Sequence, residues 1–254
     1  MKLTLRIVKA LCLSAVCVFL AACDNQPKVE ETSSTNTMDV KFISQAVTDA
    51  AQVPACLDSA GVDFSEIASV NWPNEFPYKP DVKFRIAYSD AGILLHYRVT
   101  EQSIRARFAN DNDSVWTDCC VEFFSQPEDD GYYYNLECNC IGTVLCATGN
   151  TRNERTRATE DVLKSISRWS SLGRDTFEEI EGEKTWELAL IVPTSVYFKH
   201  NITSLAGKTF KANFYKCGDA LKVPHFVSWN PINIEKPDFH RPDFFGEIHF
   251  VAEK

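Results

Sequence analysis

The chain has 254 residues, of which 44% are hydrophobic and 24% are charged, and its formal net charge at pH 7 is −9. This acidic balance excludes a broad basic surface of the kind that binds nucleic acid or anionic lipid. Once the N-terminal segments described next are set aside, about 210 residues remain, a length that suits one all-β domain.

The N-terminus has the pattern of an export signal. Three basic residues precede an apolar run over residues 10–20, which is too short to span a bilayer. Residues 20–23, with the sequence LAAC, resemble a bacterial lipobox. We therefore expect residues 1–22 to be a lipoprotein signal peptide and Cys23 to carry the lipid that anchors the protein to a membrane. Loss of the three basic residues changes the net charge from −9 to −12.

The segment after the lipobox is polar. Residues 24–41 are rich in Thr, Ser, Asn, Glu and Lys and contain too few apolar residues for a packed core. The expected organisation is a lipidated N-terminus and flexible tether over residues 23–41, followed by one folded domain over residues 42–254. The expected location is the cell envelope, on the periplasmic or surface face of the outer membrane, with the leaflet left open.

Seven cysteines remain after the signal and the anchor are removed. Export would permit disulfides, but an odd number cannot pair completely. Zinc is an alternative, yet the chain has no C-x2-C pair, and Cys119 and Cys120 point to opposite faces of a strand, so they cannot share one tetrahedral ion. We expect most of these cysteines to be small buried hydrophobic side chains.

Short runs rich in aromatic and β-branched residues, separated by turn formers, dominate the rest of the chain. Strands are predicted at residues 82–88, 93–99, 115–124, 132–142, 186–192, 210–215 and 246–251. Only residues 159–172 have helical spacing. This pattern predicts an all-β fold: an antiparallel β-sandwich of two sheets, jelly-roll-like, with one short surface helix.

The hairpin formed by residues 115–124 and 132–142 carries polar side chains on one face. Residues two apart in a strand share a face, which groups Trp116, Asp118, Cys120 and Glu122 on one strand and Asn135, Glu137 and Asn139 on the other. An indole can cover the C–H face of a sugar while carboxylates and amides bind its hydroxyls. The plainer interpretation is a half-buried hairpin with one solvated face.

Catalytic motifs would leave specific traces, and the sequence contains no G-x-S-x-G elbow, H-E-x-x-H helix, phosphate-binding glycine loop or G-x-G-x-x-G fingerprint. A glycosidase needs only two carboxylates, so it stays an alternative. Glu122 lies in an apolar run, where an unpaired carboxylate is costly to bury. It is therefore either a functional group or a member of a core salt bridge.

A second constellation lies near the C-terminus. Residues 237–246 read as a loop because prolines and aspartates interrupt them, yet they carry Phe239, His240, Arg241, Phe244 and Phe245. Aromatic side chains on a loop either plug the end of a sandwich or form a recognition surface.

Two pairs of segments carry a resemblance to a known family. Residues 116–124 and 239–246 resemble the family 9 carbohydrate-binding module, particularly the family 9-like lipoproteins of gut-type bacteria. Residues 215–219 and 224–229 are similar to a signature of that subgroup. The resemblance covers residues 81–251, and it implies a β-sandwich that holds a sugar between two aromatic rings.

The resemblance also implies roles for particular residues. Trp116 falls on the first ring, Glu122 on the carboxylate of the same strand, and Asn139 on an amide one strand over. Glu137 stands where the family has a basic side chain, and Cys119 replaces a common acid. The nearest match to the second ring, usually Trp, is Phe239, followed by His240 and Arg241. Family members bind structural calcium, for which oxygen ligands could come from Asp111, Asp113, Asp129 and Asp130.

The expected function is therefore non-catalytic binding of a mono- or oligosaccharide in carbohydrate catabolism, with no required cofactor, no nucleic acid partner and no identified partner glycosidase. The first alternative is a glycoside hydrolase. The second is a redox or haem-binding sandwich of the DOMON type, which would need an axial His or Met, although Met1 and Met38 are the only methionines and are both expected outside the fold. The third is a structural envelope subunit whose pocket has decayed.

Overall fold

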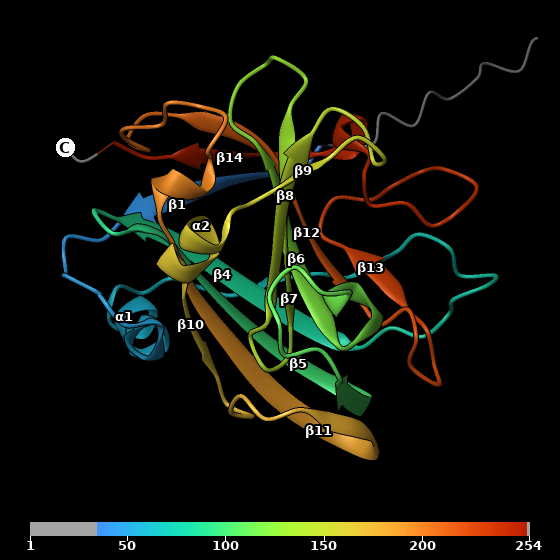
Figure 1. Cartoon of the computed structure of the whole chain (residues 1–254). Helices are drawn as coiled ribbons and strands as arrows, with labels where there is room; N and C mark the ends of the chain where they lie inside the picture. Colours follow the sequence, from blue (N-terminus) through green and yellow to red (C-terminus); the bar gives the residue numbers. More distant parts are fainter. Residues whose placement is uncertain (1–34, 253–254) are drawn as a thin grey trace, which may run out of the picture. The chain divides into compact units, whose positions relative to one another are not determined.

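The computed structural model describes residues 35–252 (Figure 1). The predicted signal peptide over residues 1–22 and the predicted lipidation site at Cys23 lie outside the described residues. None of the helices in the described part of the chain combines the length and the apolar character needed to cross a membrane.

The first sheet carries the polar hairpin. Its strands follow the order β1, β14, β12, β6, β7, β8 and β9, with β13 paired to β12 and β3 paired to β13. The bounds are β1 (Thr37–Phe42), β14 (Gly246–Phe250), β12 (Thr209–Cys217), β6 (Cys120–Gln126), β7 (Tyr133–Asn139), β8 (Val144–Gly149), β9 (Thr156–Arg157), β13 (Phe226–Ser228) and β3 (Ser69–Val70).

The second sheet is built around two long strands. It continues from β1 through β4, β5, β11 and β10, and β2 pairs with β4. The bounds are β4 (Asp81–Ser89), β5 (Gly92–Ala106), β11 (Phe177–Val192), β10 (Ser167–Ser170) and β2 (Ser65–Glu66). The predicted turn at residues 89–92 joins β4 to β5, and Gly92 adopts a φ of +124°, which an L side chain rarely takes.

The predicted all-β sandwich is confirmed, with two differences in detail. β1 pairs in parallel with both β14 and β4 and so links the two sheets, whereas the other strand pairings of the described residues are antiparallel. β1 also begins at Thr37, before the predicted domain boundary at residue 42, and it contains Met38. The apolar residues Met38, Val40 and Phe42 alternate with polar residues, as expected for a strand. Because β1 pairs with both β14 and β4, residues 37–41 of the predicted tether belong to the folded domain.

The helices are short. They are α1 (Val53–Ser59) and α2 (Glu160–Ser165), and single 3-10 turns are η1 (Ala50–Gln52), η2 (Val115–Thr117), η3 (Thr194–Val196) and η4 (Pro242–Phe244). The predicted helix over residues 159–172 was too long, because residues 167–170 pair with β11 as β10. Thr159 caps α2, its side chain accepting from the backbone N–H of Val162. α1 was not predicted.

The core between the sheets fixes which face of the first sheet remains for function. Phe214 of β12 stacks on Phe84 of β4 at 3.9 Å and on Phe123 of β6 at 5.0 Å between ring centroids. Because side chains alternate along a strand, Glu122 and Tyr215 lie on the opposite, outer face. The strand-parity prediction for β6 is confirmed from Cys120 onward.

A second apolar cluster covers this outer face, where the loop before β14 packs over β6, β7, β8 and β12. Its members include Phe124, Tyr133, Tyr215, Phe239 and Phe245. The loop thus does what one interpretation of its aromatic residues predicted: it covers part of the sheet. The uncovered remainder of the outer face forms the cavity described next.

Candidate functional site

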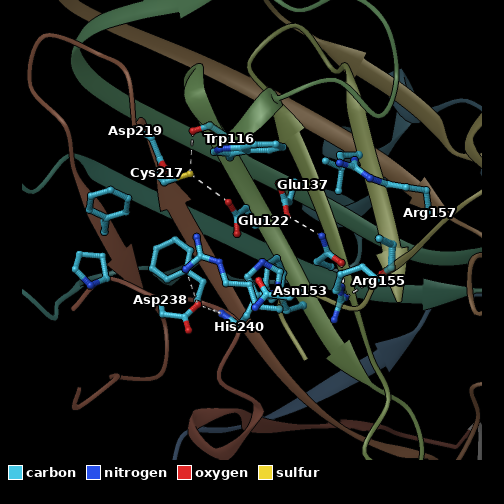
Figure 2. A pocket seen from close by; sticks show the side chains of 18 residues that line it. Trp116, Glu122, Glu137, Asn153, Arg155, Arg157, Cys217, Asp219, Asp238 and His240 are labelled. Carbon is cyan, nitrogen blue, oxygen red and sulfur yellow. Dashed lines mark hydrogen bonds and ion pairs between the residues drawn. The ribbon is translucent and has the colours of Figure 1, made fainter. Parts of the chain in front are cut away.

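A cavity of about 490 Å³ lies on the outer face of the first sheet (Figure 2). Its floor comes from β6, β7, β8 and β12, and the loop over residues 237–240 forms one wall. The segment between β8 and β9 forms another wall, and η2 contributes Trp116. Side chains from segments far apart in the sequence therefore meet over four adjacent strands.

Two glutamates face each other on the floor. Glu122 of β6 and Glu137 of β7 are directly paired across the strands, and they are 3% and 5% exposed. The Cys217 thiol donates to Glu122 Oε1 at 3.2 Å, and Asn135 Nδ2 donates to Glu137 Oε1 at 2.8 Å. Cross-strand partners on one face are close neighbours, so these carboxyl groups act on each other.

Burial shifts the acidity of both groups. Removal from water raises the pKa of Glu122 well above its usual value, and the nearby Glu137 carboxylate raises it further. Burial also raises the pKa of Glu137, to about 7, although the Asn135 hydrogen bond and the positive charge of Arg157 oppose the rise. The floor therefore favours a protonated carboxyl on Glu122 at neutral pH, with Glu137 close to its titration midpoint.

Two buried polar atoms lining this cavity lack a hydrogen-bond partner within residues 35–252. They are Oε2 of Glu137 and Nε of Arg155. The rest of the Arg155 guanidinium is fixed: Nη2 donates to the carbonyl oxygens of Tyr133 at 3.1 Å and Ala147 at 3.2 Å, and the group lies 4.1 Å from the Tyr133 ring centroid. An orphaned acceptor and an orphaned donor are costly in a folded protein.

The two predicted aromatic walls differ from each other. Trp116 is partly buried and lies in the η2 turn, not in a strand as predicted, because β6 begins only at Cys120. Phe239 stacks face to face on Tyr215 at 4.2 Å and is 8% exposed. Phe239 thus both plugs the loop against the sheet and lines the cavity.

His240 lines the same wall as a neutral imidazole. Its Nδ1 lies 3.0 Å from the Tyr133 hydroxyl. Burial lowers the pKa of His240 to about 3, and the positive charges of Arg155 and Arg152 lower it further. Next to it, the Asp238 carboxylate forms an ion pair with Arg152 at 3.3 Å.

Three of the predicted polar residues, Asp118 and Asn139 of the hairpin and Arg241 of the C-terminal loop, do not line the cavity. Asn139 is fully buried, and its Nδ2 donates to the Phe108 carbonyl oxygen at 2.8 Å and to Asp118 Oδ2 at 3.1 Å. Asp118 is also fully buried and pairs with Arg105 at 3.2 Å. Arg241 immediately precedes η4, pairs with Asp243 and does not line the cavity. The prediction that Asp118 and Glu122 share one face assumed a continuous strand. The η2 turn ends at Thr117 and β6 begins only at Cys120, so that assumption fails for Asp118.

The cavity also contains residues that the sequence analysis did not single out. They are Arg152, Asn153 and Arg155 from the segment between β8 and β9, Arg157 from β9, and Cys217 and Asp219 at the end of β12. Asn135, which was predicted on the polar face, lines the cavity as well. The run TRNERTR over residues 151–157 was a usable signal, because three arginines within six residues are unusual in an acidic chain.

The four aspartates proposed as calcium ligands do not form one site. Asp111 pairs with Arg168 through both oxygens, at 2.5 and 2.8 Å. Asp130 pairs with His200 at 3.1 Å and Asp129 with Lys211 at 3.3 Å, both in the connection between β6 and β7. Asp111, Asp129 and Asp130 already face positively charged or hydrogen-bonding partners. Within the described residues, Asp111, Asp113, Asp129 and Asp130 do not gather into one set of calcium ligands.

The seven cysteines of the domain are all buried and all present as free thiols. The prediction that most of them are buried is therefore confirmed. Four of them, Cys119, Cys138, Cys140 and Cys146, belong to the core between the sheets, and Cys56 is a buried residue of α1 itself. Cys120 and Cys217 differ because they lie in the outer-face cluster, where Cys217 lines the cavity.

Comparison with known proteins finds one matching family and several similar structures. A model of the carbohydrate-binding family 9 matches residues 51–250. The crystal structure of a candidate carbohydrate-binding protein from Bacteroides uniformis ATCC 8492 is 48% identical, with a TM-score of 0.82 over 85% of this chain and 100% of that chain. No curated protein sequence matches the chain.

Two crystal structures of a family 9 carbohydrate-binding module from Caldicellulosiruptor kristjanssonii are also similar. The glucose complex is 14% identical and covers 86% of this chain and 97% of that one. The cellotriose complex is 15% identical and covers 86% of this chain and 95% of that one. Both have a TM-score of 0.48.

Proposed function

The chain belongs to carbohydrate-binding family 9, and we propose that it binds a mono- or oligosaccharide in the cavity above Glu122 and Glu137. One observation carries this proposal. Glu137 Oε2 can only accept or share a proton and Arg155 Nε can only donate, and both are buried without partners among the described residues. A hydroxyl group both donates and accepts, so the hydroxyls of one sugar can satisfy both atoms.

The aromatic side chains suit the apolar surface of the same ligand. Trp116 at the cavity wall offers an indole face to the C–H groups of a pyranose ring. Phe239 gives a smaller surface on another wall, because Tyr215 covers one face of its ring. We therefore assign the main stacking contact to Trp116 and a packing contact to Phe239.

The polar contacts follow from the floor. Protonated Glu122 can donate a hydrogen bond to a sugar oxygen, whereas ionised Glu137 accepts from a hydroxyl, so the two carboxyls take complementary roles. Arg155 donates from the side, held in place by the carbonyl oxygens of β7 and β8. His240 and Asp238 complete the wall next to Phe239.

Isothermal titration with a panel of mono- and disaccharides tests the proposal. Purified protein is expected to bind at least one sugar with millimolar to micromolar affinity, and Trp116→Ala should weaken that binding about tenfold or more. Trp169→Ala is the matched control, because Trp169 packs against the cluster beneath α1 and does not line the cavity. Equal affinity in Trp116→Ala and in the unmodified protein would refute the site assignment.

A glycoside hydrolase is the second candidate, because paired cross-strand residues have Cβ atoms about 4.5–5.5 Å apart, near the spacing of about 5 Å between carboxyls in retaining enzymes. That mechanism needs one ionised and one protonated carboxyl, which this pair can supply. The match to a carbohydrate-binding family is what favours binding without cleavage. Release of reducing sugar from a polysaccharide panel, abolished in Glu122→Gln, would instead establish the hydrolase.

We also propose that the protein is an envelope lipoprotein anchored through Cys23, on the strength of the apolar run and the LAAC sequence that precede the domain. Metabolic labelling with a radioactive fatty acid should mark the protein, and Cys23→Ser should abolish the label. A labelled Cys23→Ser variant would contradict the anchor.

A further inference from the structure

Three side chains of the metal-ligating type, from Cys120, Glu122 and Cys217, lie together at the base of the cavity. Figure 2 shows two of them, Glu122 and Cys217. Cys217 of β12 and Cys120 of β6 are directly paired across the two strands, and Glu122 follows two residues along β6 on the same face. One ligand atom from each, two sulfurs and a carboxylate oxygen, lie within 4.8 Å of one another. All three side chains are at least 97% buried.

This spacing is close to that of a bound tetrahedral ion. With Zn–S bonds of about 2.3 Å and Zn–O bonds of about 2.1 Å, neighbouring ligand atoms of such an ion lie roughly 3.5 Å apart. To bind an ion, the ligand atoms would therefore need to move by only about an ångström, which side-chain rotation can provide. The strands that carry Cys120, Glu122 and Cys217 are already in register. Elsewhere in residues 35–252, no other group of three His, Cys, Asp or Glu side chains gathers this closely.

The donor set selects the kind of ion. Two thiolates with one carboxylate suit a borderline-soft ion such as Zn²⁺, whereas Ca²⁺ and Mg²⁺ take oxygen ligands. Glu122 and Cys217 line the cavity, so an ion can enter from solvent and keep a fourth position on that side. Asp219 also lines the cavity next to Cys217.

The charged side chains around Glu122 are compatible with a bound cation. Within the described residues, the Glu122 carboxyl makes one side-chain hydrogen bond, from the Cys217 thiol, and it faces a second carboxyl on Glu137. The fully buried Lys216 lies on the opposite face of β12, where its Nζ contacts Glu101 at 2.9 Å and His225 Nε2 at 2.7 Å. No cationic side chain of the described part of the chain forms an ion pair with Glu122.

We propose that Cys120, Cys217 and Glu122 form a binding site for Zn²⁺ or a similar thiophilic divalent ion at the floor of the sugar cavity. Binding requires no oxidant: the ion forms two metal–sulfur bonds and one metal–oxygen bond, and the two thiols and the Glu122 carboxyl release their protons to solvent. The site does not depend on the proposed sugar binding, because the metal alone can occupy it. Sugar and metal share Glu122, so each is expected to alter the affinity for the other.

Metal titration tests this site directly. Purified protein, reduced and freed of metal, is titrated with Zn²⁺ against a chromophoric chelator and separately with Co²⁺, followed by absorption. We expect one ion per chain and, with Co²⁺, the thiolate charge-transfer and ligand-field bands of a tetrahedral complex. Cys217→Ser and Cys120→Ser should each weaken Zn²⁺ binding at least tenfold and remove most of the charge-transfer intensity.

Cys146→Ser is the matched control, because this buried thiol belongs to the core between the sheets and should leave metal binding unchanged. Glu122→Gln keeps both thiols and the side-chain volume, so it should fold, retain the charge-transfer bands and bind Zn²⁺ at least tenfold more weakly. Absence of these bands in the unmodified protein, or equal Zn²⁺ affinity in Cys217→Ser, would overturn the proposal. Sugar binding measured with a metal chelator present reports on the sugar site separately.

Discussion

Glu122 and Glu137 stand directly opposite each other on β6 and β7, with both carboxyl groups buried on the outer face of the sheet. Two like groups in this position disfavour simultaneous ionisation. No side-chain cation of the described residues forms an ion pair with either carboxyl. Hydroxyl groups or a bound cation could therefore stabilise the pair. This relationship connects the sugar site and the metal site that we propose.

Glu137→Gln separates the two roles of this pair. The amide removes the like-charge repulsion and should leave the free energy of unfolding unchanged or slightly higher. It also removes an acceptor whose charge-assisted hydrogen bond is worth about 1.5–3 kcal/mol, so sugar affinity should fall roughly tenfold or more. Calorimetric titration and urea unfolding measure the two effects. A variant that binds sugar normally but unfolds more easily would show that Glu137 only supports the fold.

Arg155→Met tests the side wall. Its guanidinium donates to four backbone carbonyl oxygens, of Tyr133, Ala147, Gly149 and Thr151, and to Asn135 Oδ1. Removing it takes a charged donor from all of these acceptors, so the free energy of unfolding should fall by about 2–4 kcal/mol. The loss of the free Nε donor should also weaken sugar binding. Urea unfolding and calorimetric titration provide both measurements.

Arg152→Met is the control for that change. Arg152 is a more exposed arginine whose ion pair with Asp238 lies at the cavity edge. Exposed pairs contribute about 0–1 kcal/mol, so this variant should unfold almost as the unmodified protein does. Equal destabilisation by Arg152→Met and Arg155→Met would argue against the bracing role of Arg155.

The fold was largely readable from the sequence because strand alternation and turn residues are local. The hairpins around residues 89–92 and 126–131 formed as predicted, and so did the later strands. The parallel pairing of β1 was not readable, because it depends on partners about fifty and more than two hundred residues away. Met38, Val40 and Phe42 alone form too short a run to identify a strand.

The candidate site was readable only in part. Trp116, Glu122, Glu137, Phe239 and His240 line one cavity, although only a resemblance to a family joined the two halves. The η2 turn could not be predicted, because the residues of Val115–Thr117 are typical of strands. As a result, the ion pair between Asp118 and Arg105 was not predicted either. The pairing of Cys120 with Cys217 depends on the register of β6 against β12, which no local spacing encodes.

Asn139→Ala tests a correction to the sequence analysis, which placed this amide on the sugar. Asn139 holds the Phe108 carbonyl oxygen and Asp118, and its own Oδ1 accepts from the Thr143 N–H at 2.9 Å. The variant should lose about 1–3 kcal/mol of stability, because buried hydrogen-bonding partners are left unpaired. Sugar affinity at a temperature where the variant is folded should change less than twofold. A large loss of affinity without a loss of stability would restore Asn139 to the binding site.

His240→Gln tests the neutral imidazole in the cavity wall. Folding lowers the pKa of His240 to about 3, whereas an unfolded chain has a His pKa of about 6.5. As the pH falls below the unfolded value, the unfolded chain takes up the proton first, so stability present near neutral pH is lost progressively toward acid. Between about pH 7.5 and about pH 5, unmodified protein should lose roughly 2 kcal/mol more than the variant. Urea unfolding at both pH values measures this difference. The other histidines are common to both proteins, so parallel losses in the two would show that His240 is protonated in the folded state.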